Sequence, residues 1–332
     1  MISLDFYNKD VKNRYLETIE EVSRDTIGYI LYKATPLEKL LNRDLYTFSL
    51  EEIGSVMSHS NPLNNRVAER TALILNKYIH WALENGYYTT NMHPMRGIKK
   101  NWAHDFVADK ELFVSEDRLI KIEDDLDNFQ DKVSLRLPFE GIMGSDLSEI
   151  LNLKAEDVYD NGILKLHDSK KEEREAQVSD RAISFIKGAL SESSYKKWST
   201  SEDKKMITDF EALVENDYVI RGLRRKKGED KNQPQGYQTV YRRIKTIMDK
   251  ENLNYITAKQ LQRSGMLAMA ARLIKERGKY TVKERDEICE KYGVSHIQNG
   301  NYLYYNYVSI NFINEKNLKK YYNIDLNTVS SK

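Results

Sequence analysis

The chain has 332 residues, of which 40% are hydrophobic and 31% charged, with 5 Pro and 15 Gly. This composition is typical of a soluble globular protein with room for two domains, and no low-complexity tract or internal repeat is visible. The formal net charge is +1. Binding to nucleic acid must therefore rest on local basic patches, because an overall positive charge is excluded.

Targeting and redox signals are few. The first residues, MISLDFYNKD, lack the regions of a signal peptide, and no run approaches the roughly 20 apolar residues of a membrane span, so a cytoplasmic protein is expected. The single cysteine, Cys289, excludes an internal disulfide, and burial as a small hydrophobic residue is its favoured role. The histidines lack metal-ligand spacing and there is no P-loop motif, so neither a metal nor a cofactor is expected.

The first hundred residues show helical patterns. Segments 25–41 and 65–86 carry apolar residues at three- and four-residue spacing, and Gly86 is a suitable stop for the second. Ser49 and Glu52 form a capping box that predicts a short helix between these segments. Together they predict a compact bundle of about four helices.

The character of the chain changes between residues 105 and 115, where a domain boundary is expected. Ser115 is placed to cap a helix. Seven acidic residues lie between Glu116 and Asp131, and they indicate a solvated surface rather than a face for nucleic acid.

The second half is predicted to be mainly α with a small antiparallel β-sheet. Residues 135–158 have a helical pattern, whereas 158–179 give the only strong strand signal, with Asn161-Gly162 as a two-residue turn. Helices resume at residue 237. Further capping boxes are predicted at Thr281/Glu284 and Ser295/Gln298.

Basic residues crowd the segment from Arg221 to Lys245, where nine Lys or Arg stand against two acids. Such a segment is typical of a surface that follows a phosphate backbone. For residues 224–233 themselves a disordered charged loop is the favoured interpretation. The helix that follows is the better candidate for ordered DNA contact, through Thr239, Arg242 and Arg243.

A second basic site is predicted where a helix begins. Thr257 followed by Gln260 is a capping box, and Lys259, Gln262 and Arg263 then lie on one face of the first two turns. Free N–H groups, the helix dipole, two cations and an amide converge there, an arrangement that holds a phosphate. A solvated face carries the same residue types and is favoured when this stretch is taken alone.

In chain order these features resemble the tyrosine recombinases, the phage integrase family, over nearly the whole chain. Residues 78–98 resemble the end of that family's core-binding domain. Four segments then follow in the order of its catalytic domain: GIMGSDLSEILNLKAEDV, NGILKL with REAQVSDRAISFI, YITAKQLQRSG and YGVSHIQNGNYLYYNYVS. The resemblance implies a helical core-binding (SAM-like) DNA-binding domain, residues 1–108, and a catalytic-like domain with a C-terminal helical tail, residues 109–332, forming a two-domain clamp.

The resemblance fails at the catalytic residues. Such enzymes use arginines, a lysine, histidine-type groups and a tyrosine, because the charge of the scissile phosphate must be neutralised while the tyrosine attacks. At the matching positions for arginine, histidine, arginine, histidine and tyrosine this chain has Asp146, Lys259, Gln262, Val294 and Leu303. Only the hairpin lysine keeps a candidate, Lys170 or Lys171. We therefore expect no catalytic residues.

A shift by one residue offers an alternative. Tyr304 or Tyr305 would then be the nucleophile, His296 the histidine and Arg263 an arginine. This alternative requires several compensating changes, because loss of one preorganised donor costs roughly 10²–10³ in rate and Asp146 adds a repelling anion. The tyrosines at 302, 304, 305 and 307 are more simply packing aromatics at helical spacing.

The degenerate resemblance implies a sequence-specific repressor that maintains the lysogeny of a prophage. Its partners would be double-stranded DNA operators, whose phosphates bind at Lys259, Gln262 and Arg263, and a phage-encoded antirepressor or modulator protein. An active or crippled recombinase is the second hypothesis. A partner-binding protein that has lost DNA binding is the third, and the basic surfaces disfavour it. Base recognition is expected from Asn65, Arg66 and Arg70, although ordinary surface residues of these types are as frequent.

Two further expectations concern packing. The opposite charge changes at Asp146 and Lys259 predict that these side chains interact. Residues 308–326 carry more apolar side chains than a free tail should expose. We expect this tail to fold back on its own domain, with Lys316, Lys319 and Lys320 in solvent. The protein would then be largely monomeric in solution, with self-association on DNA left open.

Overall fold

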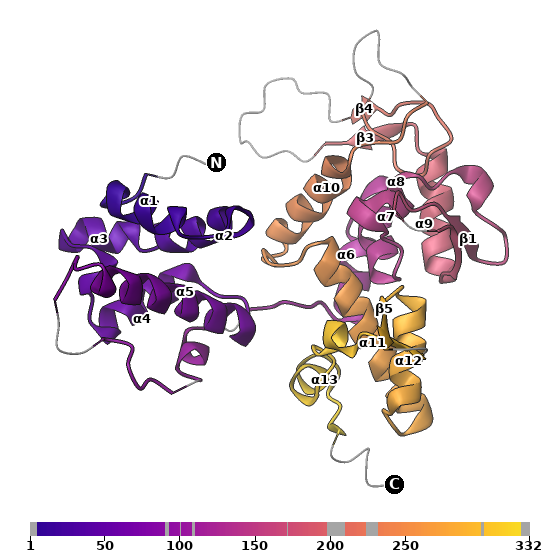
Figure 1. The fold of residues 1–332 in the computed structure, drawn as a ribbon. Coiled ribbons are helices and arrows are strands. Elements are labelled where there is room, and N and C mark those ends of the chain that lie inside the picture. Colours follow the sequence, from indigo (N-terminus) through magenta and orange to yellow (C-terminus); the bar gives the residue numbers. More distant parts are fainter. Residues whose placement is uncertain are drawn as a thin grey trace. The chain divides into compact units, whose positions relative to one another are not determined.

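The structure is a computed structural model that describes residues 5–89, 93–99, 101–107, 110–170, 172–197, 210–223, 232–299 and 302–326. The chain divides into two compact units, Met1–Lys110 and Glu111–Lys332, each with its own buried core (Figure 1). This division falls close to the boundary expected between residues 108 and 109. Within the described ranges no helix is long and apolar enough to cross a membrane.

The N-terminal unit is helical, as predicted. Its elements are α1 (Lys9–Glu17), α2 (Glu21–Tyr32), α3 (Thr35–Leu41), η1 (Leu45–Thr47), α4 (Leu50–Ser60), α5 (Asn65–Glu84) and η2 (Trp102–Phe106). The single helix predicted over 25–41 is divided, because Pro36 in the first turn of α3 has no N–H to donate and its ring would clash with a carbonyl one turn earlier.

Local capping signals in this unit are confirmed. The Ser49 hydroxyl accepts a hydrogen bond from the Glu52 N–H at 3.3 Å, and the Glu52 carboxylate accepts one from the Ser49 N–H at 2.8 Å. Gly86 follows α5 with a φ of 73°, a left-handed conformation that ends a helix. These interactions fix the two ends of the segment that carries α4 and α5.

The C-terminal unit is also mainly helical. Its described helices are α6 (Glu116–Asp124), α7 (Phe129–Phe139), η3 (Ser145–Leu147), α8 (Ser148–Leu151), η4 (Ala155–Asp157), α9 (Asp180–Ser191), α10 (Tyr237–Lys250), α11 (Ala258–Arg277), α12 (Val282–Lys291), η5 (Tyr307–Ile310) and α13 (Glu315–Tyr322). The predicted class, mainly α with small antiparallel pairing, is confirmed.

Strand pairing is more extensive than predicted. The described strands form three two-stranded antiparallel sheets rather than one: β1 (Ile163–Leu166) with β2 (Arg174–Gln177), β3 (Ser194–Lys196) with β4 (Phe210–Ala212), and β5 (His296–Asn299) with β6 (Tyr302–Tyr305). Asn161-Gly162 lies before β1, in a turn closed by the Gly162 N–H on the Tyr159 carbonyl at 3.1 Å, and not between β1 and β2. The turn signal was right, since Val158 and Leu164 on either side of the turn form an antiparallel bridge, but the turn does not connect β1 to β2.

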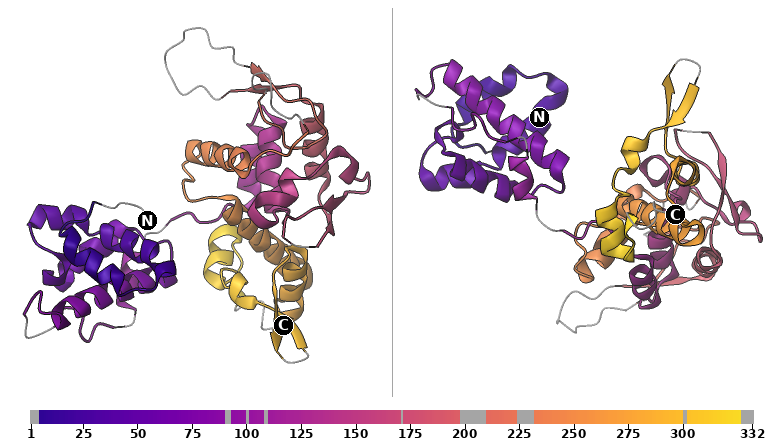
Figure 2. Two further views of the ribbon diagram at one scale, coloured as in Figure 1. Left: turned by 45° about the horizontal axis from the view of Figure 1, so that its top comes forward. Right: turned by 90° about the horizontal axis from the view of Figure 1, so that it is seen from below.

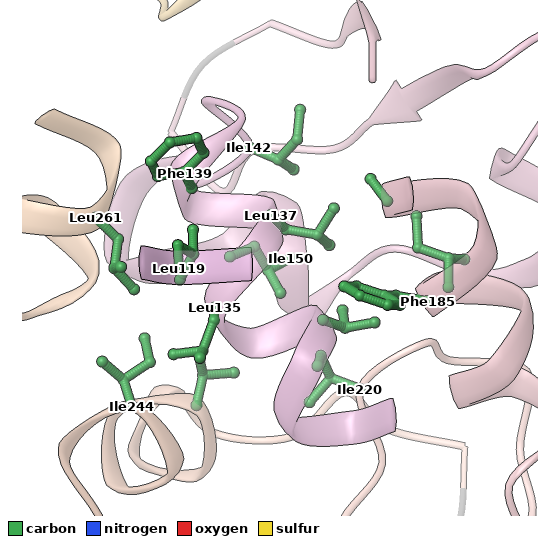
Figure 3. Close-up of a cluster of buried hydrophobic side chains, with 14 of the residues drawn as sticks. Leu119, Leu135, Leu137, Phe139, Ile142, Ile150, Phe185, Ile220, Ile244 and Leu261 are labelled. Carbon is green, nitrogen blue, oxygen red and sulfur yellow. The ribbon is translucent and has the colours of Figure 1, made fainter. Parts of the chain in front are cut away.

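Helix α7 is the centre of the C-terminal core. Leu135 and Leu137 of α7 are fully buried, and Figure 3 shows side chains of α9, α10 and α11 gathered around them. At Gly265 of α11 a Cβ atom would lie 1.7 Å from the Phe139 carbonyl oxygen. Only glycine lets α11 approach the end of α7 this closely, and this packing fixes the helix whose first turns carry Lys259, Gln262 and Arg263.

Two acids predicted to be solvated are buried instead. Glu123 accepts hydrogen bonds from Arg136 at 2.8 Å and from Arg181 at 2.7 Å. Asp131 accepts one from the Tyr195 hydroxyl at 3.0 Å. Both carboxylates are 0% exposed, so the interpretation of 116–131 as a uniformly solvated surface was wrong. Partners from distant parts of the chain satisfy these charges, which a local acidic count does not reveal.

The C-terminal tail folds back on its own unit, as predicted. Leu318 of α13 is fully buried in a cluster with Phe113 and residues of α11 and α12. The Phe113 ring lies 5.5 Å from the Phe312 ring and 5.8 Å from the Tyr321 ring, between centroids. Its lysines, Lys316, Lys319 and Lys320, are exposed. Cys289 is buried in the same cluster, as expected, and burial raises the pKa of its thiol to about 11.

Candidate nucleic-acid interface

Asp146, which the resemblance places at the first catalytic arginine, lies on a loop with unusual backbone geometry. Asp146 and Leu147 have φ values of 55° and 67°, in the left-handed region that non-glycine residues seldom adopt. The Asp146 carboxylate is exposed and accepts a hydrogen bond from Lys170 Nζ at 3.0 Å. Asp168 accepts from the Ser145 N–H at 2.6 Å and from the Lys170 N–H at 2.7 Å. Lys170 therefore donates to one carboxylate through its ammonium group and to the other through its backbone N–H.

An ion pair that the sequence did not predict holds the backbone around the Asp146 loop. Arg174 of β2 donates two hydrogen bonds to the Glu149 carboxylate, at 2.6 and 2.8 Å, and one to the Gly141 carbonyl at 2.9 Å. Glu149 is buried and also accepts from the Met143 N–H at 2.9 Å. No local pattern links Glu149 to Arg174, because only the folded chain brings them together. Lys171, the other candidate for the hairpin lysine, lies outside the described residues.

The start of α11 differs from the predicted three-residue anion site. Thr257 caps the helix by accepting from the Gln260 N–H at 3.4 Å, as predicted. Lys259 Nζ donates to Gln262 Oε1 at 2.6 Å, and Gln262 is buried. Arg263 turns away: it donates to Gln260 Oε1 at 3.1 Å, and its guanidinium lies 5.6 Å from the Phe312 ring centroid. Burial lowers the pKa of Arg263, and these contacts within the chain engage a guanidinium group that was predicted to hold a phosphate.

The expected ion pair between Asp146 and Lys259 does not occur among the ion pairs of the described residues, where Asp146 is paired with Lys170. That prediction was wrong. The reason is the hairpin: residues 167–170 return beside the Asp146 loop and bring a lysine to its carboxylate first.

The residues that the resemblance places at the second histidine and the tyrosine are both apolar. Val294 is half-buried against the cluster that contains Cys289, and Leu303 pairs with Gln298 in the β5–β6 register. The helix start predicted at Ser295/Gln298 was wrong, because this segment forms a hairpin that extends from its unit (Figure 2). Alternating residues around Asn299-Gly300 fit a two-residue period as well as a helical one.

The hairpin brings together part of the alternative, shifted set. His296 and Tyr305 face each other across β5 and β6, with ring centroids 4.3 Å apart, and burial raises the pKa of Tyr305. Tyr304 is 43% exposed. Arg263, the arginine of that set, is held by Gln260 and Phe312 as described above.

Two adjacent arginines of α10 have different surroundings. Arg243 is 8% exposed and donates to Gln130 Oε1 at 3.2 Å and to the Arg221 carbonyl at 2.7 Å. The predicted phosphate contact is therefore wrong for Arg243, because this side chain joins α10 to α7. Arg242 is exposed and makes no hydrogen bond or ion pair with any described residue, and Thr239 is half-buried one turn earlier. The basic residues 224–231 lie outside the described part of the chain.

The first turns of α5 present the residues expected to read bases. Asn64 caps the helix by accepting from the Val67 N–H at 3.0 Å. Asn65, Arg66 and Arg70 are all exposed. Neither arginine forms an ion pair or a hydrogen bond within the described ranges, so both guanidinium groups are available to a ligand. No group of His, Cys, Asp or Glu suited to a metal occurs among the residues that were described.

Three features define the class of protein: a helical N-terminal unit, a second unit with a central buried helix and a hairpin lysine, and a fixed order of motifs. Together they are those of the tyrosine recombinase class. Two family models match it: "MrpR, N-terminal core-binding domain" over residues 6–84 and "MrpR, C-terminal catalytic domain" over residues 113–323. The chain belongs to the MrpR family. These are the two domain types, in the same order, that the resemblance predicted, and that prediction is confirmed.

A sequence relative fits this assignment. The chain is 30% identical over 321 residues to the SPbeta prophage-derived protein YopR of Bacillus subtilis strain 168, covering 95% of this chain and 96% of the relative. Among solved structures, a lambda integrase dimer bound to a COC' core site is 13% identical, with 93% of this chain and 77% of that chain covered and a TM-score of 0.46. XerA recombinase is 11% identical, with 96% and 98% covered and a TM-score of 0.41.

Proposed function

We propose that this chain is a sequence-specific double-stranded DNA-binding repressor of a prophage, which holds DNA without cutting it. The observation that carries the proposal is which residue stands at the family's first arginine position, and what that residue is paired with. Asp146 stands there, paired with Lys170, and Asp168 flanks the same lysine. A scissile phosphate at this place would meet the Asp146 carboxylate, already paired with the Lys170 ammonium group, and the Asp168 carboxylate, which accepts from the Ser145 and Lys170 backbone N–H groups. Its developing charge would be repelled rather than stabilised.

The remaining family positions support the same conclusion. Gln262 replaces the second arginine and is engaged by Lys259, and Val294 and Leu303 carry no group able to transfer a proton or attack phosphorus. DNA holding needs fewer groups: Lys259 at the capped start of α11, Arg242 on α10, and the arginines of α5 provide separate positive points. The prophage origin of the relative YopR supports a prophage context.

This function also specifies the setting. A DNA-binding repressor works in the bacterial cytoplasm, on the nucleoid, and its operators are its first partners. Release from lysogeny requires a signal, and a phage-encoded antirepressor or modulator protein is the class of partner that would deliver it. The chain would act as a monomer in solution, and neighbouring operators would bring copies together on DNA.

The second candidate, a recombinase with shifted catalytic residues, is favoured by one observation. His296 and Tyr305 are neighbours with ring centroids 4.3 Å apart, which is the pairing of residue types that a general base and a nucleophile require. The candidate lacks a cation beside this pair in the described contacts, because Arg263 is bound to Gln260 and packed on Phe312.

One experiment separates the two functions. The full chain is footprinted across the host genome, and its strongest site is then offered as a duplex with a phosphate-trapping nick. We expect sequence-specific binding, no covalent protein–DNA adduct, and increased transcription from the bound promoters when the protein is depleted. Tyr304→Phe and Tyr305→Phe should bind as the parent does. A tyrosine-linked adduct that either substitution abolishes would establish the recombinase instead.

A further inference from the structure

The exposed side of α5 carries a large apolar side chain among basic ones. Leu73 is 51% exposed. Arg66 and Arg70 precede it by seven and three residues, and Lys77 follows it by four. On a helix these intervals place all four side chains on one face. The opposite face holds the core of the unit, where Leu75 and Ile79 are fully buried.

None of the three cations is used inside the N-terminal unit. Arg66, Arg70 and Lys77 are exposed, and within the described ranges they form no hydrogen bond or ion pair. Leu73 likewise contributes little to the core of its unit. A leucine surrounded by three unpaired cations fits a ligand that offers anionic groups and an apolar group within a few ångströms of one another.

The major groove of DNA offers this combination. Phosphates and the acceptor edge of guanine suit arginine and lysine, and the 5-methyl group of thymine is the apolar feature of the groove. A helix about 10–12 Å wide fits a major groove about 12 Å wide. An acidic protein surface would satisfy the cations, but charged surface residues would leave Leu73 against polar groups.

We propose that Leu73 is a specificity-determining residue that packs against a thymine methyl group in the major groove, between the contacts of Arg66 and Lys77. This inference rests on the proposed DNA-binding function. From Arg66 to Lys77 the helix rises about 16 Å, and from Arg70 to Leu73 about 4.5 Å. Base pairs are about 3.4 Å apart, so the thymine lies one or two base pairs from the base or phosphate met by Arg70.

The test removes one partner of the contact at a time, either the thymine methyl group or the leucine side chain. Full-length protein selects duplexes from a random-sequence library, and binding to the enriched duplex is measured by fluorescence anisotropy. Each thymine is then replaced in turn by deoxyuridine, which lacks only the methyl group. At one or two adjacent positions we expect about fourfold weaker binding, the effect of uncovering one methyl group. Leu73→Ala should bind the parent duplex several-fold more weakly and lose the preference for thymine there.

Controls separate a failure of this inference from a failure of the proposed DNA-binding function. Leu40 of α3 is 78% exposed, and Leu40→Ala should leave affinity and the thymine preference unchanged. Leu73→Met should retain both, and Leu73→Ala should leave the salt dependence of binding unchanged because no phosphate contact is lost. Normal affinity of Leu73→Ala, or a thymine preference that survives it, overturns the inference alone. Absence of any enriched duplex would overturn the proposed function.

Discussion

Arg242 and Arg243 show how burial assigns different tasks to neighbouring side chains. Arg243 bonds to Gln130 and to the Arg221 carbonyl, and its guanidinium lies 5.2 Å from the Tyr195 ring centroid. Its Nε atom is 3.7 Å from a carboxylate oxygen of the buried Asp131. Arg242 points to solvent. Arg243 is therefore part of the core, whereas Arg242 is a cation that is unpaired among the described residues, as the proposed DNA contact requires.

The two alanine substitutions should separate these roles. Arg243→Ala removes the donor to the buried Arg221 carbonyl and the cation beside the buried Asp131 carboxylate, so we expect the free energy of unfolding to fall by about 2–4 kcal/mol. Arg242→Ala should change it by less than about 0.5 kcal/mol. Arg242→Ala should instead weaken binding to all sequences alike and lower the salt slope by about one. Urea unfolding and anisotropy at several salt concentrations measure both effects, and the reverse pattern would refute these roles.

A buried carboxylate in the N-terminal unit should make its stability depend on pH. Lys12 Nζ donates to Glu38 at 2.6 Å and to Asp44 at 3.1 Å, and all three side chains are buried. Burial, with the charge of Asp44 beside it, raises the pKa of Glu38 to about 7 against the pull of Lys12. Because the folded pKa exceeds the ordinary value of 4.5, this group contributes stability below about pH 4.5 that is lost as the pH rises through about 7.

The expected result is faster opening of α3 at pH 8 than at pH 5.5. Hydrogen exchange of the α3 peptide in the full chain, corrected for intrinsic exchange rates, measures it. Glu38→Gln should remove this pH dependence, whereas Glu51→Gln, an exposed carboxylate of α4, should retain it. Equal protection of the parent at both pH values would contradict the prediction.

Among the secondary-structure elements, those fixed by neighbours in sequence were predictable. The capping boxes at Ser49/Glu52 and Thr281/Glu284 form as expected, because both partners lie within one turn. The same spacing at Ser295/Gln298 belongs to a strand, where pairing between Gln298 and Leu303 decides the conformation. The strand pair β3–β4 had no visible signal, because its strands are three residues long and joined by a long segment.

The packing of α13 on its own unit can be tested by substitution. Leu318 is 0% exposed and packs with Phe113 and Ile310, so Leu318→Ala should lower the free energy of unfolding by about 2–5 kcal/mol. Lys319→Ala, the next residue on the exposed side, should change it by less than about 0.5 kcal/mol. Urea unfolding followed by circular dichroism compares them. Equal stability of the two variants would mean that α13 is not held on its own unit.

For the whole molecule, motif order predicted the class of protein better than it predicted the site. Four weak motifs in sequence identified the architecture, because a fold constrains their order. The contacts within the site could not be predicted in this way, because they join segments that are far apart in sequence. They are those of Arg174 with Glu149, Lys170 with Asp146 and Arg263 with Phe312. Residue type alone predicted the loss of catalytic groups, and the folded chain was needed to show which of the described cations are unpaired.

The last prediction concerns association. Residues 308–326 place their apolar side chains against their own unit, with Ile310, Ile313 and Leu318 all buried, so this tail has little apolar surface left for a second copy. We expect the full chain to sediment as a monomer at micromolar concentration. Shortening the chain to end at Val308 uncovers the Phe113 cluster, so it should lower stability and promote aggregation rather than release a monomer from a dimer. A stable dimer that this shortening converts to a folded monomer would show that the tail works between protomers. Added salt should leave the sedimentation of the parent unchanged, because the parent is already monomeric. It should weaken the binding of the parent to DNA, because that binding rests on local basic residues in a chain whose net charge is only +1.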